Sequence, residues 1–228
     1  MKKITKMTWG IFLMILLGVT LALSYRSPEF EIFNFCQKLD ENLMNAELRV
    51  NRTREAILND TQESLRTLIS AGQVYHQHTN LTEQFEIFFK NYEELNEFVE
   101  RVIPAMNHTI ERSNFSRIDD IINKLNESDQ LLAREMLTYQ QERVNYLVRL
   151  NELTISLSET LTDFEKMFYE TERPSQPIFY FQNIVNIFEE IEKIHQKYTF
   201  STESYYRAKT NYYLILVDMG LKEYFFGR

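Results

Sequence analysis

Apolar side chains recur at intervals of three and four residues along the whole carboxyl-terminal segment 176–226. Because an α-helix turns once every 3.6 residues, positions spaced in this way share one side of a helix. A helix with such a stripe must cover it with other elements. The pattern therefore predicts one long helix that packs against partners of similar length. Its stripe comprises Phe181, Ile184, Phe188, Ile191, His195, Tyr198, Thr202, Tyr205, Lys209, Tyr212, Leu216, Met219, Glu223 and Phe226.

Three earlier segments show the same helical spacing: 27–72, 79–126 and 128–173. Ser27 suits a helix cap, and Pro28 suits the first helical position. Ser128 is the expected cap of the third segment. Pro104 lies inside the second segment and is expected to kink it or end it, because proline lacks the backbone donor that a helix interior needs.

Only five glycines and four prolines occur among 228 residues, and Gly10 and Gly18 precede all four segments. The rest of the chain therefore has few residues that favour tight turns between strands. We expect an all-α protein. Each segment would be about 70 Å long as a helix, and short connections favour antiparallel neighbours.

The expected architecture is a long up-down-up-down four-helix bundle with coiled-coil-like packing. Two alternatives remain open. One is a three-helix core in which the second segment is broken and partly peripheral. The other is a splayed helical hairpin that completes its core only in a dimer.

Residues 7–25 form an uncharged, strongly apolar run. As a helix the run is about 28 Å long, close to the ~30 Å hydrocarbon thickness of a bilayer. Lys2, Lys3 and Lys6 precede it, and positive charge is retained in the cytoplasm. We expect a cytoplasmic tail at 1–6, a transmembrane signal-anchor at 7–25, and a body at 27–228 in the periplasm or outside the cell.

A cleaved signal peptide has a similar pattern. The small residues Ala22 and Ser24 offer a cleavage site that would release a secreted chain beginning at Tyr25. The near-spanning length and the aromatic residue at its end favour a retained single-pass anchor.

The formal net charge of −8 excludes a chain dominated by a basic surface, so no nucleic-acid partner is expected. The single cysteine, Cys36, excludes an internal disulfide. Two interpretations of Cys36 remain: a small buried side chain on the helix stripe, or an intermolecular disulfide near the membrane.

Metal and cofactor sites are not expected. His76 and His78 are the strongest candidates for metal ligands, but a metal site needs three or four ligands. His195 falls on the core stripe, where we expect a hydrogen-bonded core histidine. A pocket between helices near His195 and Tyr198 would suit a small ligand or a metal.

Six Asn-X-Ser/Thr triplets occur in the first half of the body. They are possible N-glycosylation acceptors if the host is a eukaryote, and ordinary cap or surface residues otherwise. The asparagines are Asn51, Asn59, Asn80, Asn107, Asn114 and Asn126.

Tyrosine and phenylalanine are dense in the last segment. Tyr206 and Tyr213 lie off its core stripe, and three aromatic residues stand together at its end. Because tyrosine is favoured at interfaces, these side chains are candidates for partner binding. They are Tyr206, Tyr213, Tyr224, Phe225 and Phe226.

No nucleophile elbow, zinc-protease pattern, Walker loop or dinucleotide motif occurs, so an enzyme is not expected. One apolar segment followed by four long antiparallel helices is similar in outline to the outer domains of bacterial chemoreceptors. The chain departs from them because no second apolar segment follows Phe226. We expect a non-catalytic, membrane-anchored scaffold that binds other membrane or envelope proteins or itself. The alternatives are a sensor-like ligand-binding bundle without an output domain, or a secreted helical protein.

Overall fold

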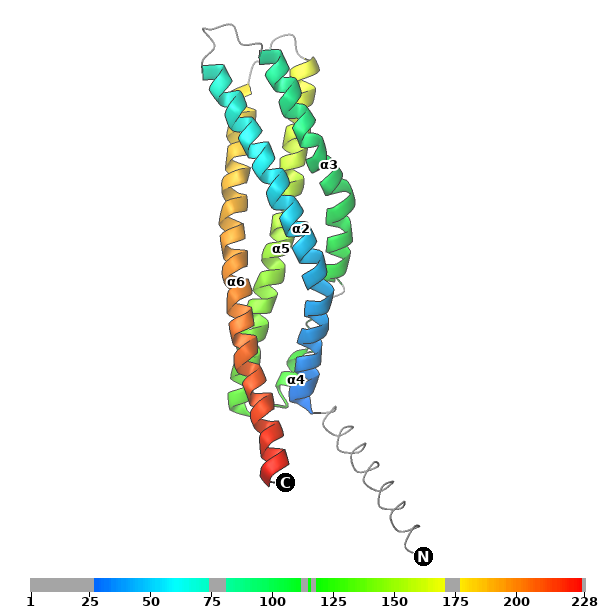
Figure 1. Ribbon diagram of the computed structural model, residues 1–228, viewed down its shortest axis with the longest axis vertical. Coiled ribbons are helices and arrows are strands. Elements are labelled where there is room, and N and C mark those ends of the chain that lie inside the picture. The colour runs from blue at the N-terminus through cyan, green and yellow to red at the C-terminus, as the bar shows by residue number, and fades with distance from the viewer. Residues whose placement is uncertain (1–26, 74–80, 112–114, 116–117, 171–176, 227–228) are drawn as a thin grey trace, which may run out of the picture. The chain divides into compact units, whose positions relative to one another are not determined.

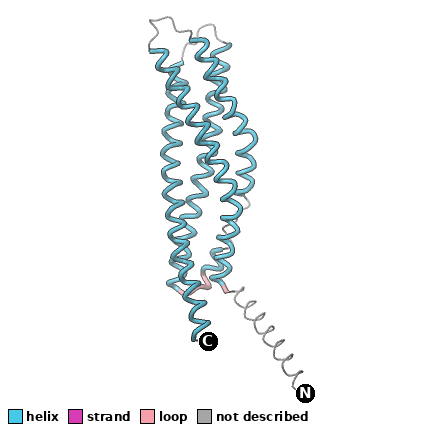
Figure 2. Tube along the Cα trace, viewed as in Figure 1, coloured by secondary structure: helices cyan, strands magenta, loops and turns pink. Residues whose placement is uncertain are grey.

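The computed structural model describes residues 27–73, 81–111, 115, 118–170 and 177–226. No strand occurs within these ranges, and nearly all of their residues are helical (Figure 2), which confirms the all-α prediction. The helices are α2 (Pro28–Gln73), α3 (Leu81–Glu111), α4 (Ile118–Ile122), α5 (Glu127–Glu170) and α6 (Pro177–Phe226) (Figure 1).

The predicted start of the first segment is confirmed. The Ser27 hydroxyl accepts a hydrogen bond from the backbone N–H of Phe30 at 3.3 Å, and α2 begins at Pro28. Pro177 likewise opens α6. In both helices proline occupies a position whose N–H would have no helical partner.

The predicted second segment, 79–126, is two helices. Pro104 lies inside α3 and does not end it. The helix instead ends at Glu111, and the short α4 follows at Ile118. Pro104 is exposed on α3.

The predicted cap at Ser128 is wrong by two residues. Asn126 Oδ1 accepts a hydrogen bond from the backbone N–H of Asp129 at 2.9 Å, and α5 begins at Glu127. The Ser128 hydroxyl donates to the same oxygen at 2.7 Å. Asn126 is therefore the cap, because its side chain satisfies a free N–H of the first turn.

The chain forms two compact units. The described residues of unit 2 come from 41–111, 140–170 and 177–203, and those of unit 1 from 27–40, 115–139 and 204–226. The boundaries between the units fall within α2, α5 and α6.

Unit 2 contains parts of four helices. Between α3 and α5, Tyr92 bonds to Glu165 and Asn107 bonds to Asn151, so these helices run antiparallel. Antiparallel pairing is also shown by Glu142–Ser201 and Phe164–Phe181 between α5 and α6, and by Glu47–Tyr198 and Glu55–His195 between α2 and α6. Unit 2 is thus a helical bundle that buries its apolar side chains within one chain.

One part of unit 2 is filled by aromatic rings around Phe164, which is fully buried on α5. We call this group the aromatic cluster. Edge-to-face and stacked contacts of this kind add to the stability gained by burial alone. The neighbouring rings, with centroids 5.2–6.5 Å from that of Phe164, are Phe85, Phe88, Phe89, Tyr180 and Phe181.

Unit 1 has its own apolar core, to which α2, α4, α5 and α6 contribute. The predicted stripes of the first and last segments supply Cys36, Tyr205 and Tyr212 to this core. Its other buried members are Ile32, Ile118, Ile122, Leu125, Ala133, Met136, Leu137 and Ala208. The second segment therefore contributes to both cores, which argues against a peripheral second arm.

Within the ranges that the structure describes, no helix combines the length and apolarity needed to cross a bilayer. The predicted span at 7–25 lies outside these ranges, so it stays a prediction from the sequence.

Candidate functional site

A group of polar side chains lies buried in unit 2, surrounded by apolar residues. We call it the central polar layer. Glu47, Arg54, Arg143 and Asn151 are all almost fully buried. Its complete membership is Glu47, Asn51 and Arg54 from α2, Asn107 from α3, Gln140, Arg143 and Asn151 from α5, and Tyr198 from α6.

The charged centre of this layer is the ion pair between Arg143 and Glu47, which joins α5 to α2. Arg143 Nη1 also donates to Gln140 Oε1 at 3.2 Å. The second carboxylate oxygen of Glu47 accepts a hydrogen bond from the Tyr198 hydroxyl at 3.1 Å. Three helices are thereby held in one register, because a buried charge is stable only when its partners surround it.

Arg54 is the second buried cation of the layer. Its guanidinium donates to Asn151 and, at 3.1 Å, to Asn51 Oδ1. It also lies 6.0 Å from the centre of the Phe98 ring. Burial lowers the pKa of Arg54 to about 10, which leaves it charged at neutral pH. Among the described residues, its Nε atom has no hydrogen-bond partner.

The donors and acceptors of the central polar layer bond mainly to one another. The layer therefore orders the helices rather than presenting reactive groups to a substrate. Sequence reasoning missed it, although a signal was present: Glu47 and Arg54 each lie one turn after an apolar stripe residue, Leu43 and Val50.

A second buried ion pair lies in unit 1, between Lys209 on α6 and Asp40 on α2. The Tyr205 hydroxyl donates to the same Asp40 oxygen at 3.1 Å. Lys209 Nζ also lies 5.2 Å from the ring centre of Tyr213 and 5.9 Å from that of Tyr206. Burial disfavours the charge of Lys209, but the hydrogen bonds to Asp40 and Tyr213, together with the negative charge of Asp40, outweigh this effect, so the pKa of Lys209 is raised.

Cys36 is fully buried beside this pair, with its Sγ 4.0 Å from Met136 Sδ. Burial, together with the negative charge of Asp40, raises the pKa of the Cys36 thiol to about 12. A thiol in this position reaches a second chain only if the helices of unit 1 open. The structure therefore favours the buried apolar alternative over the intermolecular disulfide.

We expect Cys36 to resist alkylation in the folded protein. Its thiolate fraction near neutral pH is about a thousand times lower than that of an unperturbed thiol, because the pKa is raised from 9.0 to about 12. Maleimide labelling followed by intact-protein mass spectrometry, with and without urea, measures this difference. Equal labelling rates in the two conditions would contradict the buried position.

His195 is not a core residue, contrary to the prediction. Its side chain is 43% exposed, and its Nε2 lies 3.2 Å from Glu55 Oε1 on α2. The two residues line a groove of about 370 Å³ in unit 2 with Asn59, Gln62 and Phe188. Tyr198, which was expected to share this pocket, instead directs its hydroxyl inward to Glu47.

No group of three or more metal-binding side chains occurs in the described part of the chain. His76 and His78 lie outside that part, so the structure does not place them.

Two candidate glycosylation sites have their amides in hydrogen bonds to other helices of unit 2. Asn51 Nδ2 donates to the Tyr198 hydroxyl at 3.1 Å, and Asn107 Oδ1 accepts from Asn151 at 2.7 Å. A glycan on either nitrogen would disrupt the packing of unit 2. Asn59 and Asn126 are exposed, although Asn126 Nδ2 donates to Asp129 Oδ2 at 2.6 Å within the cap of α5. Asn80 and Asn114 lie outside the described residues.

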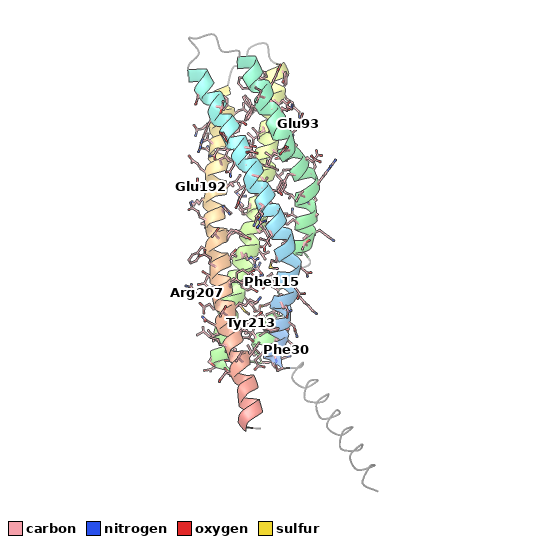
Figure 3. The ribbon with its side chains drawn as sticks, in the orientation of Figure 1. Phe30, Glu93, Phe115, Glu192, Arg207 and Tyr213 are labelled. Atoms are coloured by element: carbon pink, nitrogen blue, oxygen red, sulfur yellow. The ribbon has the colours of Figure 1, made fainter. Side chains whose placement is uncertain are left out.

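The candidate partner-binding tyrosines differ in their surroundings. Tyr206 is 40% exposed. Tyr213 is half-buried, with its ring centre 4.6 Å from that of Phe33 on α2. Figure 3 labels Tyr213 together with Phe30 near the start of α2. Residues 224–226 belong to α6, but their side chains are not described.

Comparisons of the chain with protein-family models, with curated proteins and with solved structures gave no match.

Proposed function

We propose that the protein is a membrane-anchored helical scaffold that acts through protein–protein interaction or self-association rather than catalysis. In this proposal 7–25 is a retained span, 1–6 is cytoplasmic, and the body lies in the periplasm or outside the cell. The antiparallel contacts within unit 2 support an up-down-up-down course for the four arms.

The main support is a set of large apolar side chains that lie exposed although the interior of each unit is well packed. Met44 and Leu48 lie one turn apart on α2, and both are about half exposed. Tyr206 and Phe200 on α6 are exposed as well. Neighbouring exposed apolar residues such as Met44 and Leu48 are typical of surfaces that bind other proteins, and tyrosines such as Tyr206 are enriched there.

Site-specific photo-crosslinking in intact cells tests this proposal. A photo-reactive phenylalanine analogue at Tyr206 should form a discrete adduct, either with a second copy or with an envelope protein, which mass spectrometry identifies. The control position is Thr53, which is also exposed but polar. No adduct at Tyr206, or the same adducts at both positions, would contradict the proposal.

The mass of the membrane-extracted protein tests the anchor separately. The retained span predicts a mass that includes residues 7–25. A mass beginning at Tyr25 would instead support the secreted alternative.

Small-ligand binding is a second candidate function, favoured by the groove between α2 and α6. The carboxylates of Glu55 and Glu192 supply negative charge, the guanidinium of Arg66 supplies positive charge, and Phe188 supplies an aromatic surface. Such a mixture suits a small amine that carries an apolar group. A thermal-shift screen of aromatic amines should give a stabilising ligand whose effect is lost in His195→Ala and retained in the control His108→Ala. Equal shifts in both variants, or none in the wild type, would exclude this site.

A further inference from the structure

The carboxyl-terminal end of α6 extends beyond the helix that it packs against. In unit 1 the Tyr212 hydroxyl lies 3.3 Å from the backbone carbonyl of Glu29, one residue after the start of α2. The Tyr213 ring contacts Phe33. α6 then continues to Phe226, and Figure 1 shows this end passing the first turn of α2. At 1.5 Å per residue, residues 214–226 extend for about 20 Å.

We call residues 214–226 the α6 extension. Leu214 and Val217 are 61% and 56% exposed, although both are large and apolar. Leu221, Tyr224 and Phe225 share their helical register, being seven, ten and eleven residues beyond Leu214. Lys222 and Glu223 occupy other register positions, and Asp218, four residues beyond Leu214, lies at the edge of this apolar face. The sequence pattern of the extension is thus that of an amphipathic helix, and Leu214 and Val217 on its apolar face are not covered by α2.

The position of the amino-terminal apolar run indicates what covers this face. The run ends at Tyr25, and only Arg26 and Ser27 separate it from the first residue of α2. The three steps from Tyr25 to Pro28 span at most about 11 Å. If the run crosses the bilayer, the start of α2 lies close to the lipid surface. The α6 extension runs toward that surface, and its length of about 20 Å exceeds the distance from the start of α2 to the lipid.

We infer that the α6 extension lies in the outer lipid interface, with Leu214 and Val217 toward the acyl chains. This inference rests on the proposed membrane anchor. An amphipathic helix with aromatic residues at its end is suited to this environment, because its apolar face enters the acyl boundary while its charged groups stay in the headgroup layer. The extension would then be a second membrane contact that restrains the tilt of unit 1 relative to the bilayer.

Lipid quenching of a site-specific fluorophore tests the inference. Full-length Cys36→Ala carrying Val217→Cys or Leu214→Cys is labelled with an environment-sensitive dye and reconstituted in vesicles that contain brominated lipids. The control is Phe200→Cys on the same helix, at a side chain that is 60% exposed in unit 2. The same substitutions are also made in protein that retains Cys36. Because the Cys36 thiol is buried and is not expected to react, this second set shows whether Cys36→Ala itself disturbs folding.

The inference predicts blue-shifted emission and about twofold or greater quenching at positions 214 and 217, with neither effect at position 200. Absence of quenching in protein that resists carbonate extraction would overturn the inference and leave the anchor intact. A blue shift without lipid quenching would also overturn it, because a second copy of the chain would then cover the face. Release by carbonate would contradict the anchor itself.

Discussion

Replacing Arg143 by methionine is expected to lower the free energy of unfolding by about 3–5 kcal/mol. The substitution leaves the Glu47 carboxylate buried without its cationic partner, and only the Tyr198 hydroxyl remains as a described donor to it. Urea unfolding of the full chain in detergent micelles, followed by far-ultraviolet circular dichroism, measures the loss.

Arg149 provides a matched control for Arg143 on the same helix. It forms ion pairs with Glu152 and Glu190, but all three side chains are about half exposed. Arg149→Met should therefore cost about 1 kcal/mol or less. If Arg143→Met cost no more than this control, the central polar layer would not be buried as described.

A double variant separates the cost of an unpaired charge from the value of the pair. Glu47→Leu combined with Arg143→Met removes both charges and is expected to recover most of the lost stability, since buried ion pairs are often replaced by apolar residues at little cost. A double variant as unstable as Arg143→Met alone would show that loss of the ion pair itself, rather than the uncompensated carboxylate, accounts for most of the lost stability.

Phe164→Ala is the second substitution with a large expected effect. Removing the ring at the centre of the aromatic cluster leaves a cavity surrounded by rings from α3 and α6, which is expected to cost about 3–5 kcal/mol. The urea midpoint should fall with little change in slope, since the surface exposed on unfolding is nearly the same.

The control for Phe164→Ala is Phe200→Ala, which removes the same ring from an exposed position. We expect it to change stability by about 0.5 kcal/mol or less. Similar losses in the two variants would mean that Phe164 is not the centre of a packed cluster.

The helices themselves were predictable from local sequence. Proline positions marked the starts of α2 and α6, and the spacing of three and four residues identified the buried positions Cys36, Tyr205 and Tyr212. These signals are local, because helix starts and the sides of a helix depend on residues within a few turns.

Polar burial was not predictable in the same way. His195 lies on the apolar stripe yet is 43% exposed, whereas Glu47 and Arg143 are buried. Periodicity assigns a residue to one side of its helix, but not to the centre or the rim of the surface covered by neighbouring helices. The end of α3 at Glu111 was likewise not predicted, because the sequence indicated only a kink or an end at Pro104.

The sequence by itself determined that this chain forms long helices with apolar stripes, and it predicts an apolar anchor before them. Only the tertiary structure decided that Arg143 meets Glu47 from 96 residues away, that Cys36 lies against Met136, and that α6 continues past the start of α2. The physical reason is that such contacts depend on the relative register of distant helices, which is set by packing between them rather than by the spacing within any one of them.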